Sequence, residues 1–244
     1  MAILLTYLKV LLMRHAQSVG NVKKLMEGQS STALSPEGYG QAHRLSDALI
    51  QAGHPSQRPT HVYSSPLLRA SQTARVLTED LTSVSHGCCF RQEPALSEMH
   101  AGIFQGLTWA EAEAAYPKVC QQLRSASLSW HPVPEAESLM EVRQRAQGWV
   151  RHLLSCHQPG DVVWGVSHEG ILQHIIAALM GCDRTWKIAI AHTAIFEFWL
   201  AETPPSLPTS LQNASPWQHL GPDQFNTEYW QVRRFNDASH LCCR

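Results

Sequence analysis

Two basic side chains follow an apolar segment near the start of the chain. The stretch LLMRHAQSVGN, residues 11–21, runs from leucines straight into Arg14 and His15. An arginine offers a fork of N–H donors that matches phosphate oxygens, and a histidine acts as a nucleophile or as a donor, depending on its protonation. Two later segments carry similar groups: the turn SSPLLR contains Arg69, and VVWGVSH ends at His168. These residue types indicate chemistry on a phosphate.

The segments that carry these groups have the character of strands that alternate with helices. Residues 4–13, 60–65 and 161–168 are apolar or β-branched runs, whereas residues 34–53, 66–81 and 170–181 show apolar residues at helical spacing. This alternation favours an α/β domain with a largely parallel sheet. Ligands of such sheets bind beyond the carboxyl ends of the strands, so we expect the four basic groups to share one electropositive pocket.

The remaining chain completes the expected architecture. Residues 108–158 are expected to be helical, with a break at Pro117, a Pro-containing link over residues 130–138 and a capping box from Ser138 to Glu141. Residues 193–201 predict a strand, residues 202–226 a Pro-rich loop, and residues 228–235 an edge strand that is open to pairing across a homodimer. We therefore expect one domain over residues 1–244, a three-layer α/β/α fold with a mostly parallel central sheet, helices on both faces and a helical insertion over 108–158.

Composition narrows the classes of function. Hydrophobic residues make up 44% of the chain, enough for a substantial core, and the formal net charge of -1 gives no basic field for nucleic acid or anionic membranes. The seven cysteines are odd in number and show no C-x-x-C spacing, which predicts reduced thiols in the cytoplasm. The opening segment MAILLTYLKVLLM lacks the basic start and the cleavage site of a signal peptide, so we expect it to be a buried strand.

Five fragments in the same order give the chain a family resemblance. The fragments LLMRHAQSVGN, LSPEGYGQA, VYSSPLLRASQTA, LSEMHAGIFQGLTW and VSHEGIL, which lie between about residues 9 and 200, together resemble the histidine phosphatase superfamily. This superfamily includes the cofactor-dependent phosphoglycerate mutases. The resemblance implies a phosphoric monoester hydrolase of the histidine acid phosphatase type that acts on a small phosphorylated metabolite and requires neither a metal nor a cofactor.

The resemblance also implies a role for each catalytic residue. His15 would attack phosphorus and form a phosphohistidine that water then hydrolyses. Arg14, Arg69 and His168 would surround the transferring phosphoryl group and stabilise the charge on its oxygens. Glu98 would protonate the leaving alkoxide and later accept a proton from the attacking water.

Four further residues are expected to contact the substrate. Ser18, Asn21 and Gln29 would supply neutral donors to the phosphate pocket. Glu169 belongs to the sequence SHEG, where most relatives have SHG. In the first turn of a helix it either interacts favourably with the helix dipole or, as we also consider, meets an amino or hydroxyl group of the substrate.

Two other functions remain open from the sequence. A phosphoglycerate mutase would need a tyrosine and a lysine that bind the substrate carboxylate, but Ala101 and Trp109 lie at those places, and the helical middle has no adjacent pair of arginines. We therefore expect net hydrolysis. The second alternative is a catalytically silent phosphate-binding module, which the presence of all five expected catalytic groups disfavours.

Overall fold

A six-stranded sheet forms the centre of the protein. The structure, a computed structural model, describes residues 6–51, 58–82, 88–125, 133–182, 184–201 and 230–242. The strand order is β3-β2-β4-β1-β5-β6, and the neighbouring strands from β3 to β1 pair in parallel, whereas β5 is antiparallel to both of its neighbours. The strands are β1 (Tyr7–Arg14), β2 (His61–Ser64), β3 (Cys89–Gln92), β4 (Val162–Ser167), β5 (Ile195–Ala201) and β6 (Gln231–Asp237). This sheet confirms the predicted, mostly parallel arrangement.

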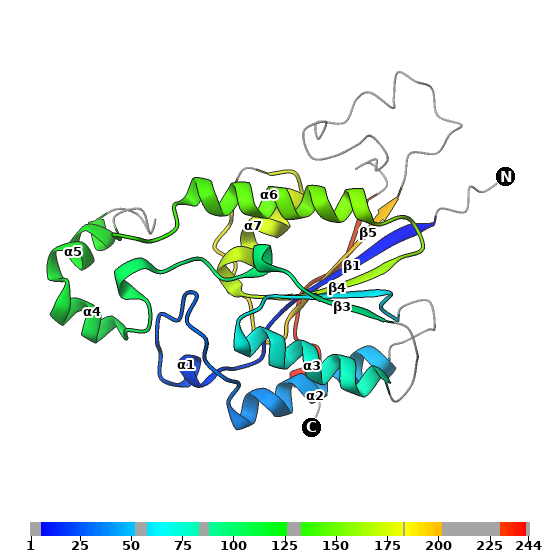
Figure 1. The fold of residues 1–244 in the computed structure, drawn as a ribbon, viewed down its shortest axis with the longest axis horizontal. Coiled ribbons are helices and arrows are strands. Elements are labelled where there is room, and N and C mark those ends of the chain that lie inside the picture. Colours follow the sequence, from blue (N-terminus) through cyan, green and yellow to red (C-terminus); the bar gives the residue numbers. More distant parts are fainter. Residues whose placement is uncertain are drawn as a thin grey trace, which may run out of the picture.

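Helices cover both faces of the sheet. In Figure 1, α6 (Leu139–Cys156) and α7 (Glu169–Leu179) lie above it, and α2 (Pro36–Gln51) and α3 (Leu68–Thr82) lie below it. The alternation of side chains along β1 explains this sandwich: Leu8, Val10 and Leu12 belong to the core under α6 and α7. Leu11 and Met13 belong to the core against α2 and α3. The three-layer α/β/α fold is therefore confirmed.

The helical insertion lies beside the sheet. The helices α4 (Trp109–Ala115) and α5 (Pro117–Ser125) form a separate lobe in Figure 1 and pack around the buried ring of Phe104. Residues 133–138 are not helical, in agreement with the predicted Pro-containing link, and residues 126–132 lie outside the described residues. Among the described residues, the remaining elements are the short helix α1 (Val19–Val22) and the 3-10 turns Pro94–Leu96, Gly102–Phe104 and Ser239–Leu241.

Local signals in the sequence set several helix ends. The Ser35 hydroxyl accepts a hydrogen bond from the Gly38 amide at the start of α2. The predicted capping box of Ser138 and Glu141 is present at the start of α6. The strand β3 was not predicted, because its four residues are all exposed and show no alternation of apolar side chains.

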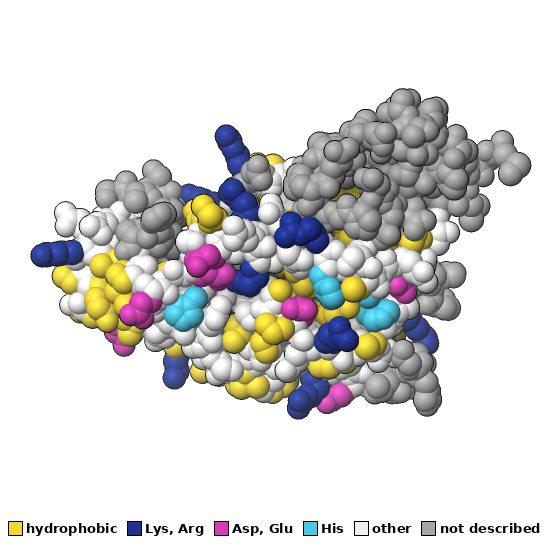
Figure 2. All heavy atoms as spheres, turned by 45° about the horizontal axis from the view of Figure 1, so that its top comes forward, with side chains coloured by type: hydrophobic (Ala, Val, Ile, Leu, Met, Phe, Trp, Pro, Cys, Tyr) yellow, Lys and Arg dark blue, Asp and Glu magenta, His cyan; other side chains and the backbone are white. Residues whose placement is uncertain are grey.

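The edge strand β6 and the surface charge are relevant to the partners that the sequence predicts. The predicted last strand is β6, which lies at one edge of the sheet. The predicted Pro-rich loop over 202–226 lies outside the described residues. Within the described part of the chain, no helix combines the length and the apolar character needed to cross a membrane. On the face that Figure 2 shows, the lysine and arginine side chains lie scattered among acidic and apolar ones.

Candidate active site

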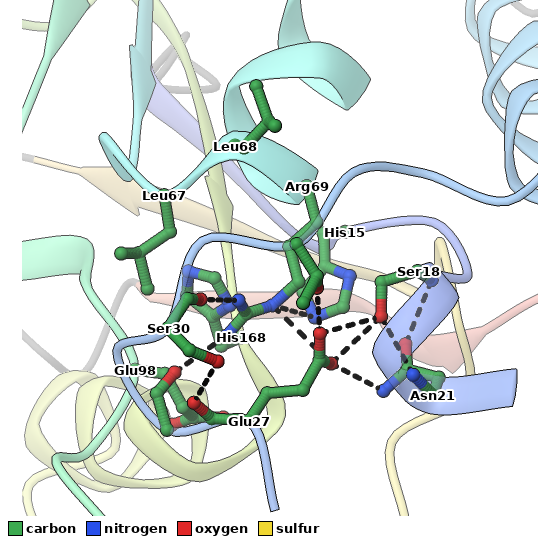
Figure 3. Close-up of polar contacts among 12 residues, drawn as sticks. His15, Ser18, Asn21, Glu27, Ser30, Leu67, Leu68, Arg69, Glu98 and His168 are labelled. Atoms are coloured by element: carbon green, nitrogen blue, oxygen red, sulfur yellow. Dashed lines mark hydrogen bonds and ion pairs between the residues drawn. The ribbon is translucent and has the colours of Figure 1, made fainter. Parts of the chain in front are cut away.

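The predicted catalytic groups converge at the carboxyl ends of β1 and β4. Arg14 is the last residue of β1, His15 follows it, and His168 follows β4. Arg69 comes from the first turn of α3, which begins directly after the turn that follows β2. The rings of His15 and His168 have their centroids 4.9 Å apart. Figure 3 shows His15, His168 and Arg69 around one centre, so the sequence-based convergence is observed.

The hydrogen bonds of His15 define its tautomer. Its Nδ1 lies 2.7 Å from the Ala16 carbonyl oxygen, which accepts only, so Nδ1 carries the proton. Nε2 lies 3.2 Å from Arg69 Nε, which donates to it. The Nε2 lone pair therefore points at Arg69 Nε, and this hydrogen bond has to open before Nε2 attacks phosphorus. This is the geometry of a nitrogen nucleophile that is held in place and needs no proton removed before it attacks.

Burial keeps the histidines of the site neutral. His15 and His168 are at most 2% exposed, and this desolvation lowers the pKa of each well below 6.5, with help from Arg69 and Arg14. His168 Nε2 lies 2.8 Å from the Ser65 hydroxyl, and its Nδ1 has no hydrogen-bond partner among the described residues. His168 therefore has one ring nitrogen available to a ligand.

A third histidine lies beside His15 and was not predicted. The ring centroid of His192 is 5.9 Å from that of His15, and burial followed by Arg14 lowers the pKa of His192 to about 4. His192 precedes β5, the antiparallel strand, so the amino end of β5 lies at the same edge as the carboxyl end of β1. The sequence contained this histidine, but nothing in its pattern revealed the direction of the strand.

Both arginines of the site already have partners. Arg14 Nη1 lies 2.9 Å from Glu169 Oε2 and 2.5 Å from the Ile190 carbonyl oxygen. Arg69 donates from Nη1 to the Ser30 carbonyl at 2.7 Å and from Nη2 to the Gly28 carbonyl at 2.8 Å. Arg69 thus fastens the loop after α1 to α3 while its Nε faces His15. Glu169, in the first turn of α7, serves as the partner of Arg14.

The loop after α1 brings an unpredicted carboxylate into the site. Glu27 is 7% exposed, and its two oxygens accept from the Ser18 hydroxyl at 2.9 and 2.8 Å. The Asn21 amide donates to it at 2.8 Å, the Thr32 hydroxyl also donates to it, and Arg69 Nε lies 3.7 Å away. Figure 3 shows the carboxylate pointing between Arg69 and the pair Ser18 and Asn21. The side chains expected to bind phosphate therefore bind this carboxylate.

Two neighbouring residues make room for Glu27 and brace its loop. A Cβ on Gly20 would lie 2.3 Å from Glu27 Oε1, so the absence of a side chain at position 20 admits the carboxylate. Gln29, predicted to reach the pocket, donates instead to the Glu98 carbonyl at 3.0 Å. Its backbone N–H donates to the Gln105 side chain at 2.8 Å. Gln29 thus connects the loop to the segment that carries Glu98.

Glu98 lies at the amino end of α7. Its carboxylate accepts from the backbone N–H groups of Met99, Gly170 and Ile171 at 2.8, 3.0 and 3.1 Å. A cavity of about 190 Å³ opens between this carboxylate and Glu27. Other lining residues are Met26, Gly28, Met99, His100, Ala101 and Gly170. The cavity has room for the organic part of a small ester next to the Glu98 carboxylate.

The charge of the site differs from the sequence-based expectation. We expected an electropositive pocket from two arginines and two histidines, but the pKa shifts leave His15 and His168 neutral. Burial lowers the pKa of Arg14, and Coulombic attraction from the carboxylates of Glu169, Glu98 and Glu27 opposes this shift, so these three carboxylates act on the guanidinium. This balance of positive and negative charge was not predicted, because the residue type alone did not show that Glu27 turns inward.

Comparisons with known proteins agree with the fold and the site. The pattern of the histidine phosphatase superfamily (branch 1) matches residues 10–207. The chain is 31% identical over 179 residues to the glucosyl-3-phosphoglycerate phosphatase of Mycobacterium tuberculosis, covering 70% of this chain and 75% of that protein. It is 28% identical over 184 residues to the metal-independent phosphoserine phosphatase of Arabidopsis thaliana, covering 74% and 72%.

A solved structure supports the same assignment at the level of the fold. The native structure of a mycobacterial glucosyl-3-phosphoglycerate phosphatase superposes with a TM-score of 0.67 at 24% identity, over 94% of this chain and 99% of that one. The family pattern spans the segments that carry Arg14, His15, Arg69, Glu98 and His168. On these grounds the chain belongs to the histidine phosphatase superfamily.

Proposed function

We propose that this protein hydrolyses small phosphate monoesters through a phosphohistidine on His15, without a metal ion. The observation that carries the proposal is the tautomer of His15: the Ala16 carbonyl holds the proton on Nδ1, and Nε2 is left with its lone pair beside Arg69. The lowered pKa keeps the ring neutral at pH 7, so the nucleophile is ready without a separate base. The names of the two phosphatase relatives support the same activity.

The reaction would proceed in two displacements at phosphorus. His15 Nε2 forms a bond to phosphorus while the ester P–O bond breaks, and protonated Glu98 delivers a proton to the leaving alkoxide. Water then attacks the phosphohistidine, Glu98 takes a proton from it, and the P–N bond breaks to release inorganic phosphate. Arg14, Arg69 and His168 would stabilise the charge on the phosphoryl oxygens in both steps.

Hydrolysis is favoured over mutase chemistry by the cavity beside Glu98. Ala101 lines this cavity with a methyl group, and the other lining side chains of this segment are Met99 and His100. An arginine or lysine for a substrate carboxylate is not among the described lining residues. A phosphoglycerate would therefore bind through its phosphate alone, and transfer to water would compete with transfer back to a second hydroxyl.

We further propose that the enzyme is of the histidine acid phosphatase type and that the substrate phosphate takes the place of the Glu27 carboxylate. The phosphate of a substrate needs the donors that Glu27 occupies, namely Ser18, Asn21 and Thr32. The carboxylate and the phosphate repel each other, so the carboxylate has to turn away from these donors when the substrate binds. Once the Glu27 carboxylate has left, Ser18 and Asn21 would donate their hydrogen bonds to the phosphate of the substrate, as the sequence predicts.

Two further expectations concern the protein as a whole. We propose that residues 1–244 act as one domain in the cytoplasm on a small phosphorylated metabolite, with neither nucleic acid nor a membrane as partner. We also propose a homodimer through the edge strand β6, where Val232 and Phe235 are 50% and 46% exposed. Light scattering on the full chain, compared with a Val232→Lys variant, tests the dimer.

The activity is tested with the full-length protein in the presence of EDTA. We expect release of inorganic phosphate from p-nitrophenyl phosphate and phosphoserine, and an acid-labile phosphoryl group on the quenched protein. His15→Ala should abolish both signals, whereas His43→Ala, on the exposed side of α2, should leave them unchanged. Undiminished turnover by His15→Ala, or complete loss of turnover in EDTA, would contradict the proposal. Interconversion of phosphoglycerates without phosphate release would favour the mutase instead.

A further inference from the structure

A second cluster of polar side chains lies at the amino ends of the parallel strands, whereas the candidate active site lies at their carboxyl ends. His61 is the first residue of β2, Asp161 directly precedes β4, and His157 follows the last turn of α6. Because β2 and β4 are parallel, their amino ends lie at the same edge. One possible ligand atom from each of the three residues lies within 4.8 Å of the other two.

We propose that His61, His157 and Asp161 form a binding site for Zn²⁺. The distance from His157 Nδ1 to Asp161 Oδ2 is 3.4 Å. Ligands at 2.0–2.1 Å from a tetrahedral zinc ion lie about 3.3 Å apart, so this pair already has the spacing of two zinc ligands. The His61 and His157 rings have their centroids 4.5 Å apart and meet at 70°, and a ring nitrogen of His61 lies within 4.8 Å of the two other ligand atoms.

The surroundings of His157 orient it as a ligand. His157 is 5% exposed, its Nε2 lies 3.0 Å from the Tyr63 hydroxyl, and its Nδ1 has no hydrogen-bond partner in the described part of the chain. If Nε2–H donates to the tyrosine oxygen, the lone pair of Nδ1 faces Asp161. A ligating histidine usually has its second ring nitrogen held in this way by a neighbouring acceptor.

Thr60 organises the other two residues. Its hydroxyl oxygen lies 2.9 Å from His61 Nδ1 and 3.4 Å from Asp161 Oδ1, and it accepts the Val162 backbone N–H at 3.1 Å. The hydroxyl is therefore anchored to the start of β4 and holds His61 and Asp161 next to each other. His61 and Tyr63 are two residues apart on β2 and share the face that meets the end of α6.

The donor set selects the metal. Two imidazoles and one carboxylate suit Zn²⁺, whereas Mg²⁺ and Ca²⁺ prefer oxygen ligands alone. His61 and Asp161 are partly exposed, so a fourth ligand can come from solvent. Bound zinc would join the end of α6 to the starts of β2 and β4. This inference does not depend on the proposed phosphatase activity, because the site lies at the other edge of the sheet.

The test measures zinc binding by the full-length protein after removal of metals with EDTA and dialysis. Calorimetry should show one equivalent of bound Zn²⁺, and the unfolding temperature should rise with added Zn²⁺ but not with Mg²⁺. His61→Ala and Asp161→Asn should each weaken zinc binding by at least about tenfold and remove the rise in unfolding temperature. Cobalt(II) alone should give visible absorption that both variants lose.

A matched control separates this site from the many other cysteines and histidines. His152 is exposed on the last turns of α6, 3.5 Å from Cys156 Sγ, and is outside the proposed ligand set. His152→Ala should bind zinc as the wild type does. The proposal is overturned if wild-type protein shows no saturable binding, or if His61→Ala and Asp161→Asn bind zinc as tightly as His152→Ala. Failure of the phosphatase assay would leave these outcomes unchanged.

Discussion

Replacing Glu27 with glutamine should strengthen phosphate binding while it weakens the fold. The carboxylate lies 3.7 Å from Arg69 Nε, where two unit charges interact by about 4.5 kcal/mol at an effective dielectric constant of 20. A phosphate among the same donors would feel a repulsion of similar size, so carboxylate and phosphate cannot both stay in place. Solvation of the displaced carboxylate recovers part of this cost. We therefore expect Glu27→Gln to lower the inhibition constant of inorganic phosphate by about 10- to 100-fold, or about 1.4–2.8 kcal/mol.

The free energy of unfolding should change in the opposite direction. Glutamine keeps one carbonyl oxygen for Ser18 and Asn21, but it leaves the buried guanidinium of Arg69 without its negative partner. This change should cost about 1–3 kcal/mol in the absence of phosphate. Saturating phosphate should recover that loss by binding only to the folded state. A carboxylate that competes with phosphate should give tighter phosphate binding and a lower free energy of unfolding when it is replaced. A purely structural carboxylate should give only the loss of stability.

The assay combines inhibition by phosphate at pH 7 with denaturant unfolding in the presence and absence of phosphate. Glu37→Gln is the matched control, because Glu37 also pairs with an arginine, Arg44, but on the exposed side of α2. Gly20→Ala offers an independent route, since its Cβ would meet Glu27 Oε1 at 2.3 Å and push the carboxylate away. If Glu27→Gln bound phosphate no more tightly than Glu37→Gln, the reasoning would be wrong.

Other perturbations follow from the same contacts. Arg69→Lys keeps the charge but loses the hydrogen bonds to His15 Nε2, Gly28 and Ser30. In steady-state kinetics kcat/KM should fall by about 100-fold, and in denaturant unfolding the free energy of unfolding should fall by about 2–4 kcal/mol. A variant with the kcat/KM and the stability of the wild type would refute this. Glu169→Gln releases Arg14, and steady-state kinetics should show a larger loss with phosphoserine than with p-nitrophenyl phosphate; equal losses would reject a role in substrate choice. Burial lowers the pKa of His174 to about 4, below the value of 6.5 in the unfolded chain, so the unfolded state binds protons first and stability should fall by about 1–2 kcal/mol between pH 6.5 and pH 4; unfolding titrations of His174→Gln should show a shallower fall, and an unchanged slope would contradict the shift.

The fold was largely predictable because the central strands β1 and β4 bury both of their faces. In β1, residues 10–13 are all buried, and such a continuous apolar run distinguishes a central strand of an α/β sheet from an exposed one. The capping residues Ser35 and Ser138 likewise act within one turn of the chain. The strand β3 was missed for the converse reason. It pairs with β2 through backbone hydrogen bonds, and its side chains show no pattern that indicates a strand.

The site was predictable where strand ends determine it, and not where a loop does. Arg14, His15 and His168 follow β1 and β4, so their meeting is a consequence of parallel topology. Glu27 depends on the path of the loop after α1, on the space left by Gly20 and on the donors of Ser18 and Asn21. These conditions are distributed over ten residues, and none of them has a sequence pattern of its own.

The observed contacts imply that substrate binding is an exchange of anions. The amides of Gly170 and Ile171 at the start of α7 donate to Glu98, so the positive end of this helix is already occupied. Arg14 is paired with Glu169, and Arg69 lies beside Glu27. A phosphate can pair with these two arginines only if the carboxylates turn away from them. We therefore expect the protein to prefer phosphate esters that carry a cationic group near Glu169, because this group would pair with the carboxylate that Arg14 releases.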